Sequence, residues 1–134
     1  MFYAGLGKDR RRYQRLNVNF TAFYKVNSPP VLRTQLGEGE IETSTLDVSK
    51  GGISFLSKHN LPPWSTLLMK LFMFKMDDQG TVSFSEPIEV MGEVRSCVPS
   101  EDSDYRVGVC FKEMPKEHGI ELDRTLESAL KYYA

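Results

Sequence analysis

Cysteine and histidine are scarce in this chain, which has two of each. Cys97 and Cys110 each lie inside an apolar run typical of a strand, so we expect buried free thiols and no disulfide framework. His59 and His118 lie far apart in the sequence, and neither has metal-ligand spacing to the other or to a cysteine. The sequence therefore indicates no zinc site and no metal cofactor.

Long apolar runs are also missing. No stretch approaches the roughly 20 apolar residues that a membrane-spanning helix needs, and the basic residues near the N-terminus are followed by no apolar segment of a signal peptide. A length of 134 residues with 40% apolar content fits one domain around one core. We therefore expect a cytoplasmic protein without a membrane span, either a monomer or a homodimer.

A large net charge is absent too, because 17 Lys and Arg face 18 Asp and Glu. The distribution is uneven: residues 1–33 carry seven Lys and Arg against the single Asp9, a balance of +6, whereas residues 34–134 carry ten against seventeen, a balance of −7. A basic stripe along the fold, as binding of a nucleic-acid polymer requires, is not present. The charge pattern instead indicates a small anion bound near the N-terminus.

The basic residues concentrate in Arg10-Arg11-Arg12-Tyr13-Gln14-Arg15, four guanidinium groups in six residues. Arginine offers a flat fork of donors that matches phosphate groups and guanine edges, and Arg11 and Arg15 are close enough to hold one small anion. Residues 1–9 contain two glycines and no periodicity, which predicts a flexible N-terminal arm. A solvated basic tail is the competing interpretation.

Alternation of apolar and polar residues predicts about six strands. They cover residues 18–26, 41–48, 53–56, 67–76, 81–98 and 105–111, with a hairpin-type turn at 77–80. Within 81–98, Pro87 marks an edge position or a bulge, and the fifth strand resumes at Ile88. The run 67–76 also permits a helix, but the flanking prolines and the spacing of Phe72 and Phe74 favour a buried strand.

Local details of these strands can be predicted as well. Ile41, Thr43, Thr45 and Asp47 alternate, so we expect them to share one face. The segment 47–52 ends in two glycines, which permit positive φ and close approach of the backbone to a neighbour.

Two further expectations concern single side chains of the predicted strands and loops. Trp64 beside two prolines is expected to plug one end of the barrel rather than to serve as a stacking platform. Cys97 and Cys110 are expected to lie near each other across a hairpin.

The period becomes helical after Pro115. Apolar residues recur at i, i+4, i+7, i+8 and i+11, namely Leu122, Leu126, Ala129, Leu130 and Tyr133. This pattern predicts an amphipathic helix over about 116–133, following a barrel over about 17–112. Strands followed by one such helix favour an all-β fold, a six-stranded antiparallel barrel with the helix packed against it.

Two motifs resemble the PilZ family, bacterial receptor domains for cyclic di-GMP. Arg10, Arg11 and Arg15 match an arginine pair followed by a third arginine after three residues. Asp47, Ser49 and Gly52 match the Asp-x-Ser-x-x-Gly pattern that follows about thirty residues later. The resemblance covers about residues 9–130 and implies that residues 10–134 form a single PilZ-like domain.

The resemblance also implies a ligand-binding site. In the family the arginines hold phosphates and guanine edges, the Asp and Ser engage the base, and the Gly allows close packing. The chemistry of the residue types agrees, because Arg suits guanine O6 and N7 and an ionised Asp can accept from guanine N1 and N2. The expected function is a cyclic di-GMP receptor that signals in trans, through an unidentified downstream protein, when its N-terminal arm becomes ordered.

Two other classes of function compete with this one. Catalysis needs a positioned base, a nucleophile or metal ligands, and Asp47 beside Ser49 without a histidine supplies none, so no enzyme is expected. The alternative is a PilZ-like interaction module that does not bind the dinucleotide. Whether one or two dinucleotides bind stays open, because Arg10 beside Arg11 offers an additional fork.

Overall fold

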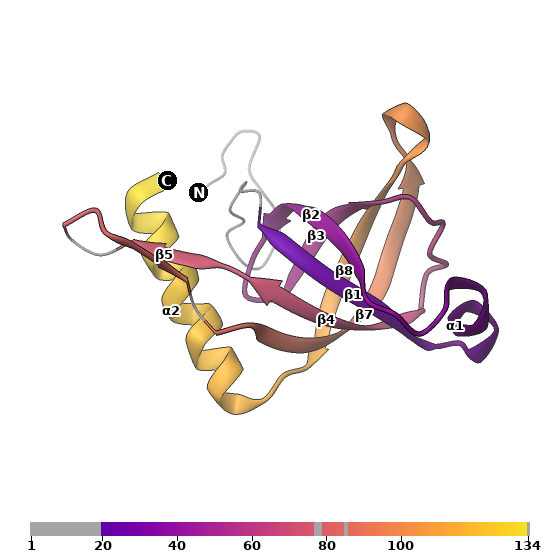
Figure 1. The fold of residues 1–134 in the computed structure, drawn as a ribbon, viewed down its shortest axis with the longest axis horizontal. Helices are drawn as coiled ribbons and strands as arrows, with labels where there is room; N and C mark the ends of the chain where they lie inside the picture. The colour runs from indigo at the N-terminus through magenta and orange to yellow at the C-terminus, as the bar shows by residue number, and fades with distance from the viewer. Residues whose placement is uncertain (1–19, 77–78, 85, 134) are drawn as a thin grey trace.

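The computed structural model describes residues 20–76, 79–84 and 86–133. Within them the chain forms eight strands, two α-helices and one short 3-10 helix (Figure 1). In chain order these are β1 (Thr21–Ser28), α1 (Pro30–Leu36), β2 (Ile41–Val48), β3 (Gly52–Ser57), β4 (Thr66–Phe72), β5 (Phe74–Met76), β6 (Val82–Phe84), β7 (Ile88–Pro99), η1 (Glu101–Ser103), β8 (Tyr105–Glu113) and α2 (Lys116–Tyr133).

Six of the strands close into a barrel in the order β1-β2-β3-β8-β7-β4, and every neighbouring pair is antiparallel. β1 pairs with both β2 and β4, so the sheet has no free edge. Alternate side chains of the strands fill the interior, among them Tyr24, Phe55, Leu67 and Val107. The predicted six-stranded antiparallel barrel is confirmed.

The apolar run 67–76 was predicted as one strand, but it divides at Met73 into β4 and β5. Phe72 pairs with Thr21, the first residue of β1, so β1 provides no strand partner beyond that point. β5 pairs with β6 instead and forms a two-stranded ribbon outside the barrel (Figure 1). The predicted hairpin therefore exists, although residues 77 and 78 of its turn lie outside the described residues.

The C-terminal helix is confirmed. α2 runs beside β5 and β7 (Figure 1) and buries Leu122 and Leu126, two of its predicted apolar residues. At its start, His118 Nδ1 accepts a hydrogen bond of 2.8 Å from the Glu89 N–H of β7. No helix in the described part of the chain has the length and apolar character needed to cross a membrane.

No helix was predicted between the first two strands, because adjacent prolines such as Pro29 and Pro30 more often mark a turn or loop. Proline also fits the first turn of a helix, where its missing N–H costs nothing. α1 begins at Pro30, buries Leu32 and stops before Gly37, whose φ of 84° is readily adopted by glycine.

The expected role of Trp64 as a barrel plug is wrong. Trp64 is 66% exposed, and Leu61, three residues earlier, is buried in the core instead. The Trp64 N–H donates to Val94 O at 2.7 Å, and a φ of 74° accompanies this position. The Arg95 guanidinium lies 4.9 Å from the centre of the exposed ring, a cation–π geometry.

The two cysteines are free thiols, but each is half-buried rather than buried. The expectation that they lie near each other across a hairpin is also wrong, because Cys97 pairs with Val107, whereas Cys110, three residues further along β8, pairs with Glu93.

Tyr24 is the largest fully buried side chain, and its hydroxyl lies 3.0 Å from Ser57 Oγ. Burial raises the pKa of Tyr24 above 10.0, because the ionised phenol would lose its contact with water; the hydrogen bond with Ser57 opposes this shift and the charge of an ionised Cys97 adds to it. The folded protein therefore retains this proton more tightly than the unfolded chain.

From this difference we predict how Tyr24→Phe changes the pH dependence of stability. Below the pKa of Tyr24 in the unfolded chain, the wild type should be more stable than the variant by about 1 kcal/mol, because the variant lacks the hydrogen bond to Ser57. As pH rises above 10.0 that advantage should shrink, because only the wild type then loses stability through the phenol. Urea unfolding of both proteins from about pH 8 to about pH 11 measures the difference. A constant difference across this range would contradict the account.

Candidate functional site

Ser49 organises the bend between β2 and β3. Its backbone N–H donates to Gly52 O at 2.9 Å, and its hydroxyl accepts a hydrogen bond of 3.2 Å from the Gly51 N–H. The side chain is buried, with 3% exposure. A serine hydroxyl that bonds the backbone two residues later stabilises a tight bend. The serine of the motif therefore has a structural role in holding the bend.

Asp47 does not share a face with Thr45, contrary to the sequence-based prediction. Thr45 pairs with Phe55 and points into the core, but the register then shifts, so that Asp47 pairs with Ser54 and Val48 pairs with Ile53. The extra residue is a β-bulge, and it moves every following side chain to the opposite face. Asp47 consequently lies on the outer face of the barrel, while Val48 is in the core.

Arg106 of β8 reaches across the outer face to Asp47. Its Nη2 donates a charge-assisted hydrogen bond of 3.3 Å to Asp47 Oδ2. The Asp47 side chain is 5% exposed and that of Arg106 is 55% exposed, so the pair presents a positive group to solvent above an enclosed carboxylate. Sequence reasoning missed Arg106; the only available signal was its outward position between inward-facing residues of a strand.

Small side chains continue this outer face beyond Asp47. The register aligns Asp47, Ser54, Gly108 and Ser96 in one row across β2, β3, β8 and β7. A Cβ added to Gly108 would lie only 2.7 Å from Ser96 Oγ, so the short side chains of this row are closely packed. The Ser54 hydroxyl is buried and makes no hydrogen bond to any described residue. This face therefore combines a carboxylate, a guanidinium and an unsatisfied hydroxyl.

Gly52 is required where β3 passes β8. A Cβ at this position would lie 2.3 Å from the backbone oxygen of Val109, a distance that side chains do not tolerate. The expected close approach of the backbone is thus present, and its partner is a neighbouring strand. The expected positive φ is not, because positive φ among glycines occurs at Gly37 and Gly80 and not at Gly51 or Gly52.

Arg10, Arg11 and Arg15 lie outside the described residues, so their positions relative to Asp47 stay a prediction. In residues 20–76, 79–84 and 86–133, no group of three His, Cys, Asp or Glu side chains is arranged to hold a metal ion. The described site offers hydrogen-bond acceptors and donors for an organic ligand.

Comparisons with known proteins place this geometry in context. A family model for the PilZ domain matches residues 9–128. No curated protein matches the chain. Among solved structures, the inhibitor of motility MotI/DgrA of Bacillus subtilis superposes with a TM-score of 0.64 at 17% identity, covering 92% of this chain and 53% of that one.

Two more structures are similar at low identity. The PilZ domain of YcgR from Escherichia coli, solved with c-di-GMP, has a TM-score of 0.57 at 16% identity and covers 92% of this chain and 94% of that one. A tetrameric PilZ domain from Xanthomonas campestris has a TM-score of 0.59 at 13% identity and covers 90% and 89%. At these identities the likeness establishes the fold. The chain spans about half of the Bacillus protein.

We predict that Gly52→Ala destabilises the barrel by roughly 1–3 kcal/mol, because the added methyl group forces two backbones apart. Gly39→Ala is the matched control, since nothing lies within 4 Å of the Cβ that it adds. Chemical unfolding measures both free energies. Equal stabilities of the two variants would show that β3 and β8 are not in close contact at Gly52.

Proposed function

Because the chain belongs to the PilZ domain family, we propose that it is a receptor for cyclic di-GMP. The observation that carries the proposal is the outward-facing Asp47 carboxylate, held by Arg106 beside a row of small residues. The family match begins at residue 9 and thus includes the arginine segment. The E. coli structure that contains c-di-GMP has the same fold, which supports the choice of ligand.

Guanine recognition is assigned to Asp47. An ionised carboxylate accepts two hydrogen bonds side by side, and guanine presents the N1 and N2 hydrogens in that arrangement. Arg106 directs the carboxylate and leaves a half-exposed guanidinium beside it, which can meet a phosphate or guanine O6. The Ser54 hydroxyl, which lacks a partner among the described residues, adds a donor next to the base.

The phosphates are assigned to the arginine segment. Arg11 and Arg15 are the principal contacts, and Arg10 provides an additional guanidinium group. Four adjacent positive groups repel one another until an anion neutralises them. We therefore propose that the dinucleotide draws residues 1–15 onto the outer face of the barrel. The surface created in this way is the signal to a downstream protein.

The protein is proposed to act by binding, without catalysing a reaction. Ser49 is engaged in the backbone of the bend, and no histidine is hydrogen-bonded to it. Nδ1 of His118 accepts a hydrogen bond from β7, and His59 bonds Ser57 through its backbone. Hydrolysing a phosphodiester without a metal usually requires a nucleophile with an activating base, and residues 20–76, 79–84 and 86–133 place no histidine in hydrogen-bond contact with Ser49.

We predict that Arg11→Ala and Arg15→Ala each weaken binding of cyclic di-GMP by on the order of 1.5–3 kcal/mol, because each removes a charge-assisted contact to the ligand. Calorimetry measures the affinity. Hydrogen exchange of the same samples should show residues 1–15 becoming protected on ligand addition in the wild type and less so in the variants.

The matched control is Arg33→Ala, which removes an arginine from α1. It should bind like the wild type, and all three variants should keep the wild-type melting temperature. If the Arg11 and Arg15 variants unfold, the segment is structural. If they bind normally, the phosphates are held elsewhere.

We also predict selectivity: cyclic di-GMP should bind tighter than cyclic di-AMP by roughly 10⁴-fold, since adenine leaves the polar groups of a guanine site unpaired. Both ligands carry the same phosphates, so contacts to phosphate cannot distinguish them. Asp47→Ala should weaken cyclic di-GMP and narrow the gap between the ligands. Competition titrations with both dinucleotides measure the ratio.

The control for this experiment is Glu42→Ala, which removes an exposed carboxylate from the same strand. This variant should leave the ratio of the affinities for cyclic di-GMP and cyclic di-AMP unchanged. Equal affinity of the wild type for both dinucleotides would remove Asp47 as the base-reading residue. Absence of binding to either would favour an interaction module that does not bind the dinucleotide.

A further inference from the structure

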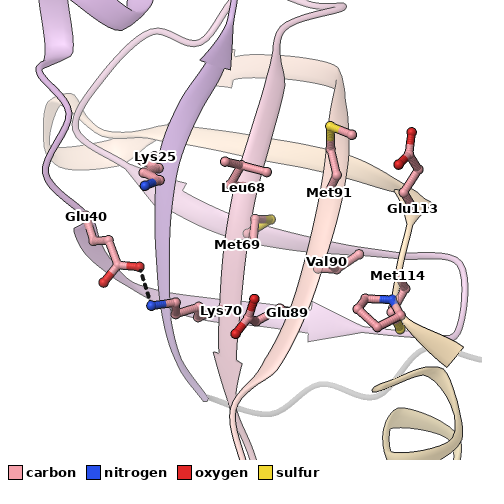
Figure 2. A pocket seen from close by; sticks show the side chains of 11 residues that line it. Lys25, Glu40, Leu68, Met69, Lys70, Glu89, Val90, Met91, Glu113 and Met114 are labelled. Carbon is pink, nitrogen blue, oxygen red and sulfur yellow. Dashed lines mark ion pairs between the residues drawn. The ribbon is translucent and has the colours of Figure 1, made fainter. Parts of the chain in front are cut away.

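A groove of about 520 Å³ lies on the outer face of β1, β4 and β7. Its residues differ from those of the Asp47 row, although β7 and β8 contribute residues to both. Its floor contains Leu68, which is 40% exposed, and Met91 (Figure 2). Figure 2 shows Lys25 on one side of these residues and Glu113 on the other. An apolar floor between charged walls is typical of an interaction surface.

The width of the groove follows from the sheet register. Lys25, Leu68, Met91 and Glu113 occupy one row across β1, β4, β7 and β8. The distance from β1 to β8 along this row equals three spacings between neighbouring strands, or about 14 Å. An α-helix with its side chains is about 10–12 Å across. A single helix lying along the strands therefore fits between the two walls.

The backbone of the floor decides which kind of segment can bind. β4 pairs with β1 on one side and β7 on the other, so its ladder hydrogen bonds are already made. An extended peptide would gain no backbone hydrogen bonds from this face and would keep its own unsatisfied. A helix satisfies its backbone internally and needs only side-chain contacts. The thioether side chains of Met91 and Met114 adapt readily to such a partner.

The charges on the two walls are opposite and largely uncompensated. Lys25 on one wall and Glu113 on the other form no ion pair with any described residue. Glu89 lies two residues from Met91 on the same face of β7, opposite Lys70, and also forms no ion pair with a described residue (Figure 2). Lys70 is neutralised by Glu40 at 3.1 Å (Figure 2). An occupant with an acidic flank toward Lys25 and a basic flank toward the two glutamates complements this pattern.

We propose that the groove binds one amphipathic α-helix of a partner protein, with an apolar stripe on Leu68 and Met91 and with polar flanks of opposite charge. This gives the chemistry of a docking partner independently of cyclic di-GMP binding. The groove meets α2 through Met114 and Pro115, so an occupant also contacts the beginning of the C-terminal helix.

The test uses two synthetic helical peptides of about 18 residues, or five turns. Both carry the same leucine stripe and the same composition. In one peptide the acidic residues form one flank and the basic residues the other; in the second the two charges alternate along both flanks. Reversing the direction of a bound helix exchanges its two flanks, so the segregated peptide can match the charges of the groove in one of its two directions. The alternating peptide matches them in neither direction and is therefore the control. Fluorescence anisotropy should show at least about tenfold tighter binding of the segregated peptide.

Three protein variants locate the binding. Leu68→Glu should weaken the segregated peptide by at least about tenfold, whereas Val98→Glu, at an apolar residue of β7 that is 50% exposed, should not change it. Glu89→Lys combined with Glu113→Lys replaces two acidic side chains of the groove with basic ones and should abolish the preference for the segregated peptide. All three changes are at the surface, and melting temperatures verify folding.

Three results would overturn the proposal. Neither peptide binds; both bind the wild type equally; or Leu68→Glu and Val98→Glu have the same effect. Sedimentation of the free protein completes the test: a dimer that Leu68→Glu dissociates would assign the groove to a second copy of this chain, whereas a monomer throughout agrees with a helix supplied by another protein.

Discussion

The bulge between Thr45 and Asp47 is the constraint on which the site depends. Without the additional residue, Asp47 would point into the barrel and Val48 would point to solvent. A carboxylate in a core filled by Phe55 and Val107 would have to be desolvated, at a cost that one hydrogen bond cannot offset. The bulge removes this conflict by one change of register: an apolar side chain enters the core, and the acid joins the outer face beside Arg106.

The same face links the packing of the strands to the geometry of the proposed site. Gly52 lets β3 approach the Val109 carbonyl, and Gly108 leaves space that Ser96 occupies. Larger residues at either position would separate β3, β8 and β7 and displace Arg106 from Asp47. The glycines thus contribute to the site through the spacing of the strands that hold it. On β4 and β7, Leu68 and Met91 occupy a separate groove, which we propose as the docking surface for a partner helix.

Features set by local periodicity were predictable, and features set by pairing were not. β2 spans Ile41–Val48 as the alternation predicted, and α2 follows its 3.6-residue period. The bulge depends on how β2 aligns with β3, and the contact between Asp47 and Arg106 joins residues far apart in the sequence. Trp64 was mispredicted because a backbone hydrogen bond to Val94, which no local pattern indicates, accompanies its exposed position.

The central claim is that the outer face around Asp47 is the dinucleotide site. Chemical-shift mapping by NMR during a titration of the wild-type protein with cyclic di-GMP tests it most directly. The account predicts large changes at Asp47, Ser54 and Gly108 and at the side-chain Nε–H of Arg106, with little change at Leu68 and Met91. Changes confined to Leu68 and Met91, or no changes at a saturating concentration of ligand, would contradict it.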